Sequence, residues 1–77
     1  GNNENVADNA ELQKALGSYR GYIVTNIEKL AAFVEAGKTS KADRLREKMQ
    51  ARFDECKNLN VNFEAETLER LKALGIS

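Results

Sequence analysis

The side chains of this sequence that could take part in chemistry are one thiol and a large set of charged groups. Cys56 is the single cysteine, and the 77 residues contain no histidine that could activate the thiol as a nucleophile. The same composition excludes the usual zinc sites, which need several cysteine and histidine ligands. The carboxylates have no histidine partner, and the sequence contains no glycine-rich loop that could bind a phosphate. We therefore expect no enzymatic activity, no metal and no other cofactor, with Cys56 acting as a small buried hydrophobic residue.

A basic segment in the middle of the chain is the other candidate for binding chemistry. Against Asp43 and Glu47 it carries six cationic residues, Lys38, Lys41, Arg44, Arg46, Lys48 and Arg52. These side chains could contact phosphates, and such binding would weaken steeply with salt. However, twelve basic residues balance twelve acidic ones and the pI is about 6.5, which is not typical of a dedicated nucleic-acid-binding protein. The basic patch leaves weak RNA binding as one alternative function.

A long amphipathic helix is predicted to precede the basic segment. Apolar residues recur from residue 12 to residue 34 with a period near 3.7, which is typical of a helix and not of a strand. Asp8 and Glu11 have the spacing of a capping box at a helix start, and Gly37 stands where a glycine C-cap belongs. The pattern predicts a helix over about 9–36.

A second helix is predicted to carry the basic segment. Its apolar residues recur with a period near 3.6 from residue 45 to residue 74, and Gly75 follows. A single helix over about 41–74 is the first interpretation. Three asparagines are poor helix-interior residues and good capping residues, namely Asn58, Asn60 and Asn62. A break near 60–62, giving a short third helix, is therefore the alternative.

The short connector between these helices predicts an all-α antiparallel two-helix hairpin. We expect residues 8–77 to form this single helical domain, and residues 1–7 to be a disordered leader or a remnant of protease cleavage. Because a chain of this size buries only a thin core, we expect oligomerisation to complete the fold.

Self-association is the function that the apolar pattern favours. Apolar side chains outside the main helical stripes predict a contact surface, with five residues at or near it: Tyr22, Phe33, Phe53, Val61 and Leu68. The predicted second helix is basic at its start and acidic later. Two copies paired antiparallel near Phe53 would set unlike charges together, so a homodimer is the first expectation. The alternatives are a solvated mixed-charge face and an adaptor domain that binds a helix of a partner protein.

One segment of the predicted second helix is similar to a known family. Residues 44–59 read RLREKMQARFDECKNL and resemble the Gag-like N-terminal region of Bel/Pao-type LTR retrotransposon polyproteins. The family pattern has upstream leucines, an aromatic residue, two acidic residues, a bulky apolar residue and a leucine position. Leu45, Met49, Phe53, Asp54, Glu55, Cys56 and Leu59 stand at these positions.

The segment from Leu16 to Gly21 is similar to the family's first helix. Together the two segments extend the resemblance over about residues 12–63. The chain departs from the pattern where Arg52 takes an apolar place and where Cys56 replaces a larger aromatic residue. The resemblance implies a structural segment of a retroelement-derived polyprotein that helps Gag-type chains associate. It carries over no catalytic residue.

The sequence shows no membrane span and no targeting signal. No run approaches the roughly 18–20 apolar residues that a spanning helix needs, and no signal peptide is visible. We therefore expect no membrane association and an intracellular protein, cytoplasmic or nuclear.

Overall fold

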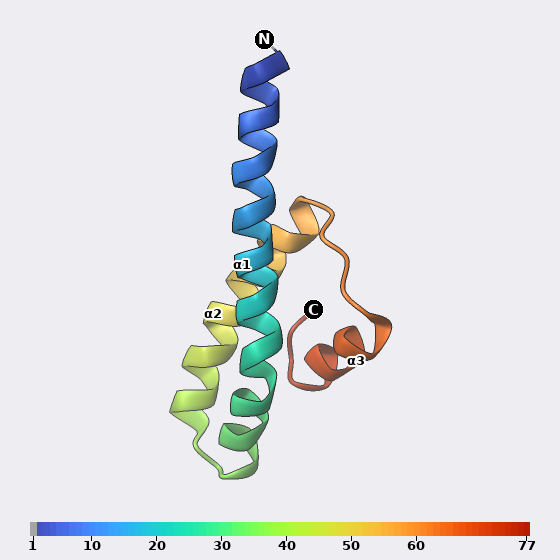
Figure 1. Cartoon of the computed structure of the whole chain (residues 1–77). Helices are drawn as coiled ribbons and strands as arrows, with labels where there is room; N and C mark the ends of the chain where they lie inside the picture. The colour runs from blue at the N-terminus through green and yellow to red at the C-terminus, as the bar shows by residue number, and fades with distance from the viewer. Residues whose placement is uncertain (1) are drawn as a thin grey trace.

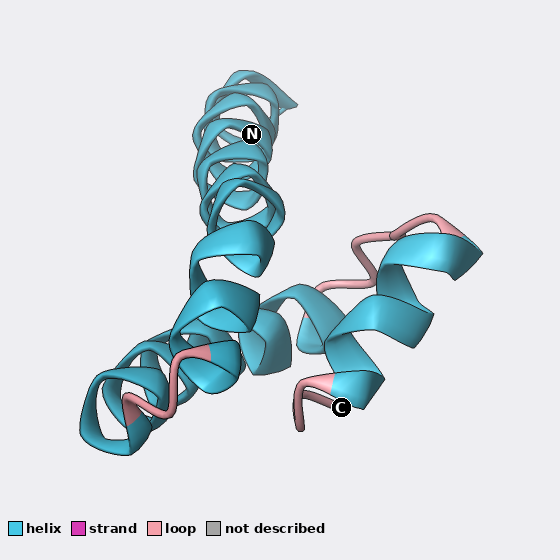
Figure 2. Cartoon of the chain, turned by 90° about the horizontal axis from the view of Figure 1, so that it is seen from below, coloured by secondary structure: helices cyan, strands magenta, loops and turns pink. Residues whose placement is uncertain are grey.

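The computed structural model describes the backbone of residues 2–77 and the side chains from residue 10 onward. Helices account for the regular structure of the described residues: α1 over Asn2–Glu35, α2 over Thr39–Asn58 and α3 over Ala65–Ala73. α1 and α2 form an antiparallel hairpin, and α3 lies to one side of it (Figures 1 and 2). The predicted all-α hairpin with a short third helix is confirmed.

α1 ends where the sequence predicts, because Gly37 adopts a left-handed φ of 71°. In this conformation the Lys38 N–H donates to the Phe33 carbonyl at 2.9 Å and the Gly37 N–H to the Val34 carbonyl at 3.1 Å. These two bonds form a Schellman motif, which satisfies the last carbonyls of the helix. The same motif closes the other two helices, around Asn60 and Gly75.

The start of α1 differs from the prediction. The helix begins at Asn2 rather than near residue 9, so the predicted leader over 1–7 is helical from its second residue and Asp8 and Glu11 lie inside the helix. The sequence ahead of Asp8 contains no proline, and no glycine after Gly1. Because extending an existing helix costs far less than nucleating one, a polar segment without a breaker can continue it.

The continuous helix over 41–74 is wrong, and the alternative break near 60–62 is confirmed. α2 ends at Asn58, and Asn60 takes the left-handed conformation with φ 58°, which asparagine tolerates better than most residues. Residues 61–64 then carry the chain to α3 without regular structure. This break lets the chain turn back so that α3 can pack against the hairpin.

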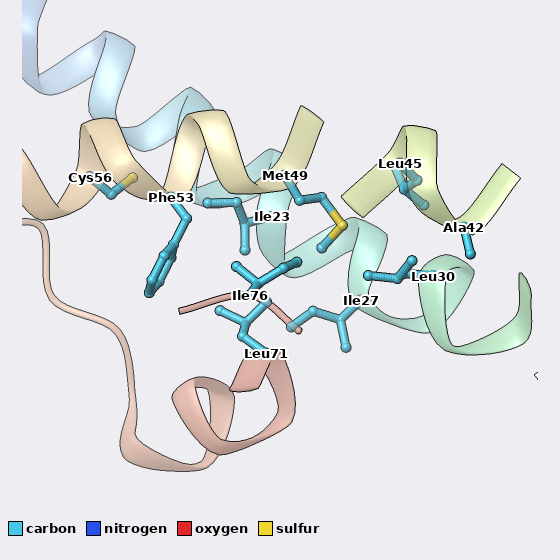
Figure 3. Close-up of a cluster of buried hydrophobic side chains, with 10 residues drawn as sticks. All are labelled: Ile23, Ile27, Leu30, Ala42, Leu45, Met49, Phe53, Cys56, Leu71 and Ile76. Atoms are coloured by element: carbon cyan, nitrogen blue, oxygen red, sulfur yellow. The ribbon is translucent and has the colours of Figure 1, made fainter. Parts of the chain in front are cut away.

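The core runs along the seam of the hairpin and is completed by α3 and the residues after it. Ile23 and Leu30 of α1 and Met49 of α2 are fully buried (Figure 3). Leu71 and Ile76, both fully buried, cover them from the third helix and its C-terminal turn. The second Schellman bond of α3 joins the Ile76 N–H to the Leu71 carbonyl at 2.9 Å, so the turn at Gly75 directs Ile76 into the core.

Polar contacts fasten α3 and its tail to one flank of the hairpin. The Arg46 Nε donates to the Leu74 carbonyl at 2.7 Å, and the Gln50 side-chain amide exchanges two hydrogen bonds with the Ser77 backbone at 2.9 and 3.2 Å. Arg70 of α3 pairs with Glu28 of α1. The result is an elongated molecule of 53 × 23 × 16 Å.

Candidate functional site

A groove of about 320 Å³ lies between α1 and α2 and is the candidate functional site. It is lined by residues of both helices: Tyr22, Asn26, Lys29, Phe33, Lys41, Arg44, Leu45 and Lys48. The four residues from α1 follow one another by three or four positions, so they form one stripe on that helix. Lys41, Arg44 and Lys48 have the same spacing on α2.

The groove lies on the flank of the hairpin away from α3. On α2 the residues that hold the C-terminal tail, Arg46 and Gln50, are each two positions from Lys48. Successive helical residues turn by about 100°, so a separation of two positions places side chains on opposite flanks. On α1, Glu28 contacts α3, whereas Asn26 lines the groove.

Cations and aromatic rings are paired within this groove. The Arg52 guanidinium lies 4.1 Å from the centre of the Tyr22 ring, and so joins α2 to α1. The ammonium groups of Lys29 and Lys41 lie 5.9 and 6.0 Å from the centre of the Phe33 ring. These distances fall within the range of cation–π attraction.

The charged side chains that line the groove are all cationic. Four cationic residues line it, Arg52 adds a fifth charge beside Tyr22, and no carboxylate belongs to the lining. Tyr22 and Phe33 are half-buried, so part of each ring is open to a ligand. A surface of this composition can bind carboxylates together with an apolar side chain.

The predicted basic patch is divided by the fold. Lys41, Arg44 and Lys48 line the groove and Arg52 adjoins it, whereas Arg46 lies on the other flank. Lys38 belongs to the connector that precedes α2. The six cations therefore do not form one surface, because residues two positions apart on a helix face in different directions.

The predicted self-association residues are also separated. Tyr22 and Phe33 lie in the groove, Val61 is half-buried after the end of α2, and Leu68 is 41% exposed on α3. Placing Phe53 at an interface is wrong for the folded chain. It is only 5% exposed and packs against Phe63 with the ring centres 5.4 Å apart.

The predicted antiparallel pairing of two second helices loses its basis in the structure. It requires a continuous helix with a basic half and an acidic half, and α2 ends before Glu64, Glu66 and Glu69. Of the acidic residues that remain on α2, Asp43 pairs with Arg46 at 2.7 Å and Asp54 with Lys57 at 3.7 Å. The later acidic residues lie at α3 instead.

Cys56 is fully buried in the core, as the sequence predicts. Burial raises the pKa of its thiol, an effect that the nearby Arg20 partly opposes and Glu55 reinforces. Since a reactive cysteine needs an accessible thiolate, this thiol is unsuited to nucleophilic chemistry. No helix within residues 2–77 is both long and apolar enough to cross a bilayer.

Asn26 and Lys29 are groove residues that sequence reasoning missed. Their signal was present in the spacing of Tyr22, Asn26, Lys29 and Phe33, which recur at intervals of four, three and four. Polar residues at helical spacing usually mark a solvated face, so only the position of α2 shows that these four border a groove.

The comparisons with known proteins do not identify this site. No protein-family model matches the chain, and neither the curated proteins nor the solved structures give a match. The resemblance to the Gag-like region of Bel/Pao-type polyproteins stays a prediction.

Proposed function

We propose that this chain is a non-enzymatic association module whose groove between α1 and α2 binds an acidic, partly apolar protein segment. The observation that carries the proposal is one groove that combines four lining cations and the adjoining Arg52 with two half-buried aromatic rings and no lining carboxylate. A second copy of the chain is the first candidate for the bound segment, and a partner protein is the alternative.

The chemistry of the groove favours a protein segment over RNA. The chain as a whole has no net charge, so the long-range attraction of phosphates is weak. An acidic helix would instead meet the cations with its carboxylates and the rings with an apolar side chain.

The association function agrees with the Gag-like resemblance, which implies a segment that helps polyprotein chains associate. That agreement adds no residue to the site. The proposal therefore depends on the groove itself and is tested there.

The test uses a fluorescent amphipathic peptide of glutamate and leucine as the probe, and a lysine and leucine peptide of equal length as its counterpart. Fluorescence anisotropy should show saturable binding of the acidic peptide only, weakening as salt is raised. Lys48→Glu should weaken it about tenfold, equivalent to about 1.4 kcal/mol. Lys72→Glu is the matched control, since it makes the same charge change on α3.

Two results would contradict the proposal. One is equal loss of binding in the Lys48→Glu and Lys72→Glu variants, which would indicate a general charge effect. The other is that no acidic protein segment displaces the acidic peptide, while single-stranded RNA binds preferentially. That result would favour a nucleic-acid function for the same cations.

A further inference from the structure

α3 is joined to α2 by a bend that interrupts a helical sequence pattern. The apolar period near 3.6 continues from residue 45 to residue 74, whereas the chain turns at Asn60, which has a left-handed φ of 58°. Asparagine tolerates this conformation with more strain than glycine does. Among the backbone hydrogen bonds of the described residues, none uses the N–H groups of Asn62, Phe63 or Glu64. The bend therefore depends on the packing of α3 as well as on its own residues.

The contacts that hold α3 on the hairpin are made by side chains and by the end of the chain. Leu71 and Ile76 are buried in one cluster with Ile23 and Met49 (Figure 3). Hydrogen bonds from two side chains of α2 hold the backbone that follows α3. None of these contacts requires α3 to belong to the same molecule. An α3 from another copy would fit the same face of the hairpin.

A helix that continued through the bend would carry α3 out of reach of its own hairpin. Leu71 and Met49 lie in the same buried cluster although they are 22 positions apart in the chain. In one continuous helix, 22 positions span about 33 Å. A straightened chain therefore leaves its hairpin uncovered and its α3 free, and two such chains are complementary to each other.

α1 provides apolar surface that a longer α2 would cover. Leu59 and Leu16 line the same crevice at the end of α2, and α1 continues past this point (Figure 1). In an antiparallel pair, four positions forward on one helix correspond to four positions back on the other, so Phe63 would lie near Leu12. Leu12 and Leu59 are 39% and 38% exposed in the bent chain. Their burial would favour the continued helix.

We infer that two copies of this chain exchange α3 reciprocally. Asn60 leaves the left-handed conformation, residues 59–64 become helical, and the α3 of each copy packs on the hairpin of the other. Leu71 and Ile76 of one copy then complete the core of the second, so each core is incomplete without its partner. Exchange of an identical element readily produces a dimer, because the contacts are those of the monomer. The inference does not rest on the groove, which lies on the other flank of the hairpin.

The first test changes the bend at Asn60. Asn60→Gly removes the strain of the bent chain, and Asn60→Ala increases it while favouring the helix. Asn58→Ala is the matched control, since it makes the same change at the last residue of α2, outside the bend. Each variant is refolded from urea at low and at high protein concentration, and sedimentation equilibrium gives its molar mass. High salt is used, because it weakens contacts between charged surfaces but not the apolar contacts of α3.

The wild-type chain should form dimers after refolding at high concentration. The dimer dissociation constant should fall about tenfold in Asn60→Ala and rise about tenfold in Asn60→Gly, because each dimer contains two of the altered segments. Asn58→Ala should dimerise like the wild type. Circular dichroism checks that all variants are folded.

The second test distinguishes exchange from any other dimer by cross-linking. Arg70 of α3 pairs with Glu28 of α1, so the two positions are close wherever α3 packs on a hairpin. Chains with Glu28→Cys are refolded together with chains with Arg70→Cys and treated with a short bismaleimide. Exchange should link position 28 of one variant to position 70 of the other, as identified by mass spectrometry. The wild type is the control and should give no cross-link, because its thiol at Cys56 is buried.

Three results would overturn the inference. One is an Asn60→Ala chain that stays monomeric at every concentration, and another is a dimer equally stable in Asn60→Ala and Asn60→Gly. The third is a dimer that cross-links only between like variants. The acidic glutamate–leucine peptide tests the groove separately, because Asn60 does not line it. Absence of exchange with retained peptide binding overturns this inference and leaves the proposed function intact.

Discussion

At the residue scale, Phe33 and Phe53 show two different uses of an aromatic side chain. Phe33 is half-buried in the groove with Lys29 and Lys41 beside its ring, so it is available to a ligand. Phe53 is buried against Phe63 and contributes to the core instead. We therefore assign Phe33 to binding and Phe53 to the stability of the fold.

Phe53→Ala should lower the free energy of unfolding by about 3–5 kcal/mol, because it leaves a cavity in a thin core. Phe33→Ala should cost only on the order of 1 kcal/mol and should instead weaken binding of the acidic peptide. Urea denaturation followed by circular dichroism measures the first effect, and anisotropy the second. Equal destabilisation by the two substitutions would contradict this assignment.

Cys56 gives the chain a pH dependence at the alkaline end. Burial raises the pKa of the folded thiol above its ordinary value of 9.0, so the unfolded chain ionises first as the pH rises. The contribution of this group to stability is complete below pH 9.0 and is lost as the pH rises through the folded pKa. Cys56→Ala should flatten the decline in stability above pH 9, measured as urea midpoints against pH; an unchanged decline would assign it to other groups.

At the element scale, three left-handed residues determine where the helices stop. Gly37, Asn60 and Gly75 each have a positive φ, and each closes a Schellman motif at the end of a helix. Gly37 and Gly21 therefore provide a matched pair, since one is at a helix end and the other is inside α1 with open space around its Cα.

Gly37→Ala should destabilise the chain by about 1 kcal/mol, because alanine is strained at a φ of 71°. Gly21→Ala should stabilise it by up to about 1 kcal/mol, because a Cβ there meets no atom within 4 Å and alanine favours a helix. Thermal unfolding of both variants measures the difference. Destabilisation by Gly21→Ala would indicate that another molecule contacts α1 closely at this position.

Ile76 is the residue through which the C-terminal turn stabilises the core. Ile76→Ala should cost about 2–4 kcal/mol, because the side chain is 1% exposed among Ile23, Met49 and Leu71. Val24→Ala, at a position that is 47% exposed, should cost less than about 1 kcal/mol. Urea midpoints compare the two. A small effect at Ile76 would mean that the turn contributes little to stability.

At the scale of the whole molecule, zero net charge conceals two unlike surfaces. Four cations line the groove on one flank and Arg52 adjoins it, whereas α3 on the other flank carries both signs, with Glu66 and Glu69 against Arg70 and Lys72. The two flanks of the hairpin therefore differ in charge, although the net charge of the chain is zero.

If a second copy is bound at the groove, the mass of the assembly should fall as salt rises, since the Debye length shortens from about 10 Å at 0.1 M to about 3 Å at 1 M. Light scattering at one protein concentration across this range measures the effect. Urea midpoints of the dilute monomer over the same range provide the control, because the core is apolar. An assembly that strengthens with salt would indicate a hydrophobic contact instead.

The sequence by itself determined the helical class, the hairpin, the end of α1 and the burial of Cys56. These features follow from local rules: the spacing of apolar residues, the conformational freedom of Gly37 and the absence of a histidine that could activate the Cys56 thiol. The break after α2 was visible only as an alternative, because asparagine tolerates the left-handed conformation without requiring it.

Only the tertiary structure decided which surfaces exist. Residues two positions apart on one helix face opposite flanks, so the packing of α2 on α1 separated Lys48 from Arg46 and brought Lys41 beside Phe33. The fold of α3 likewise moved three glutamates off the predicted second helix and to the far side of the hairpin. Sequence order fixes which residues share a helix face, whereas the packing of one helix on another decides which of those faces remain open to a partner.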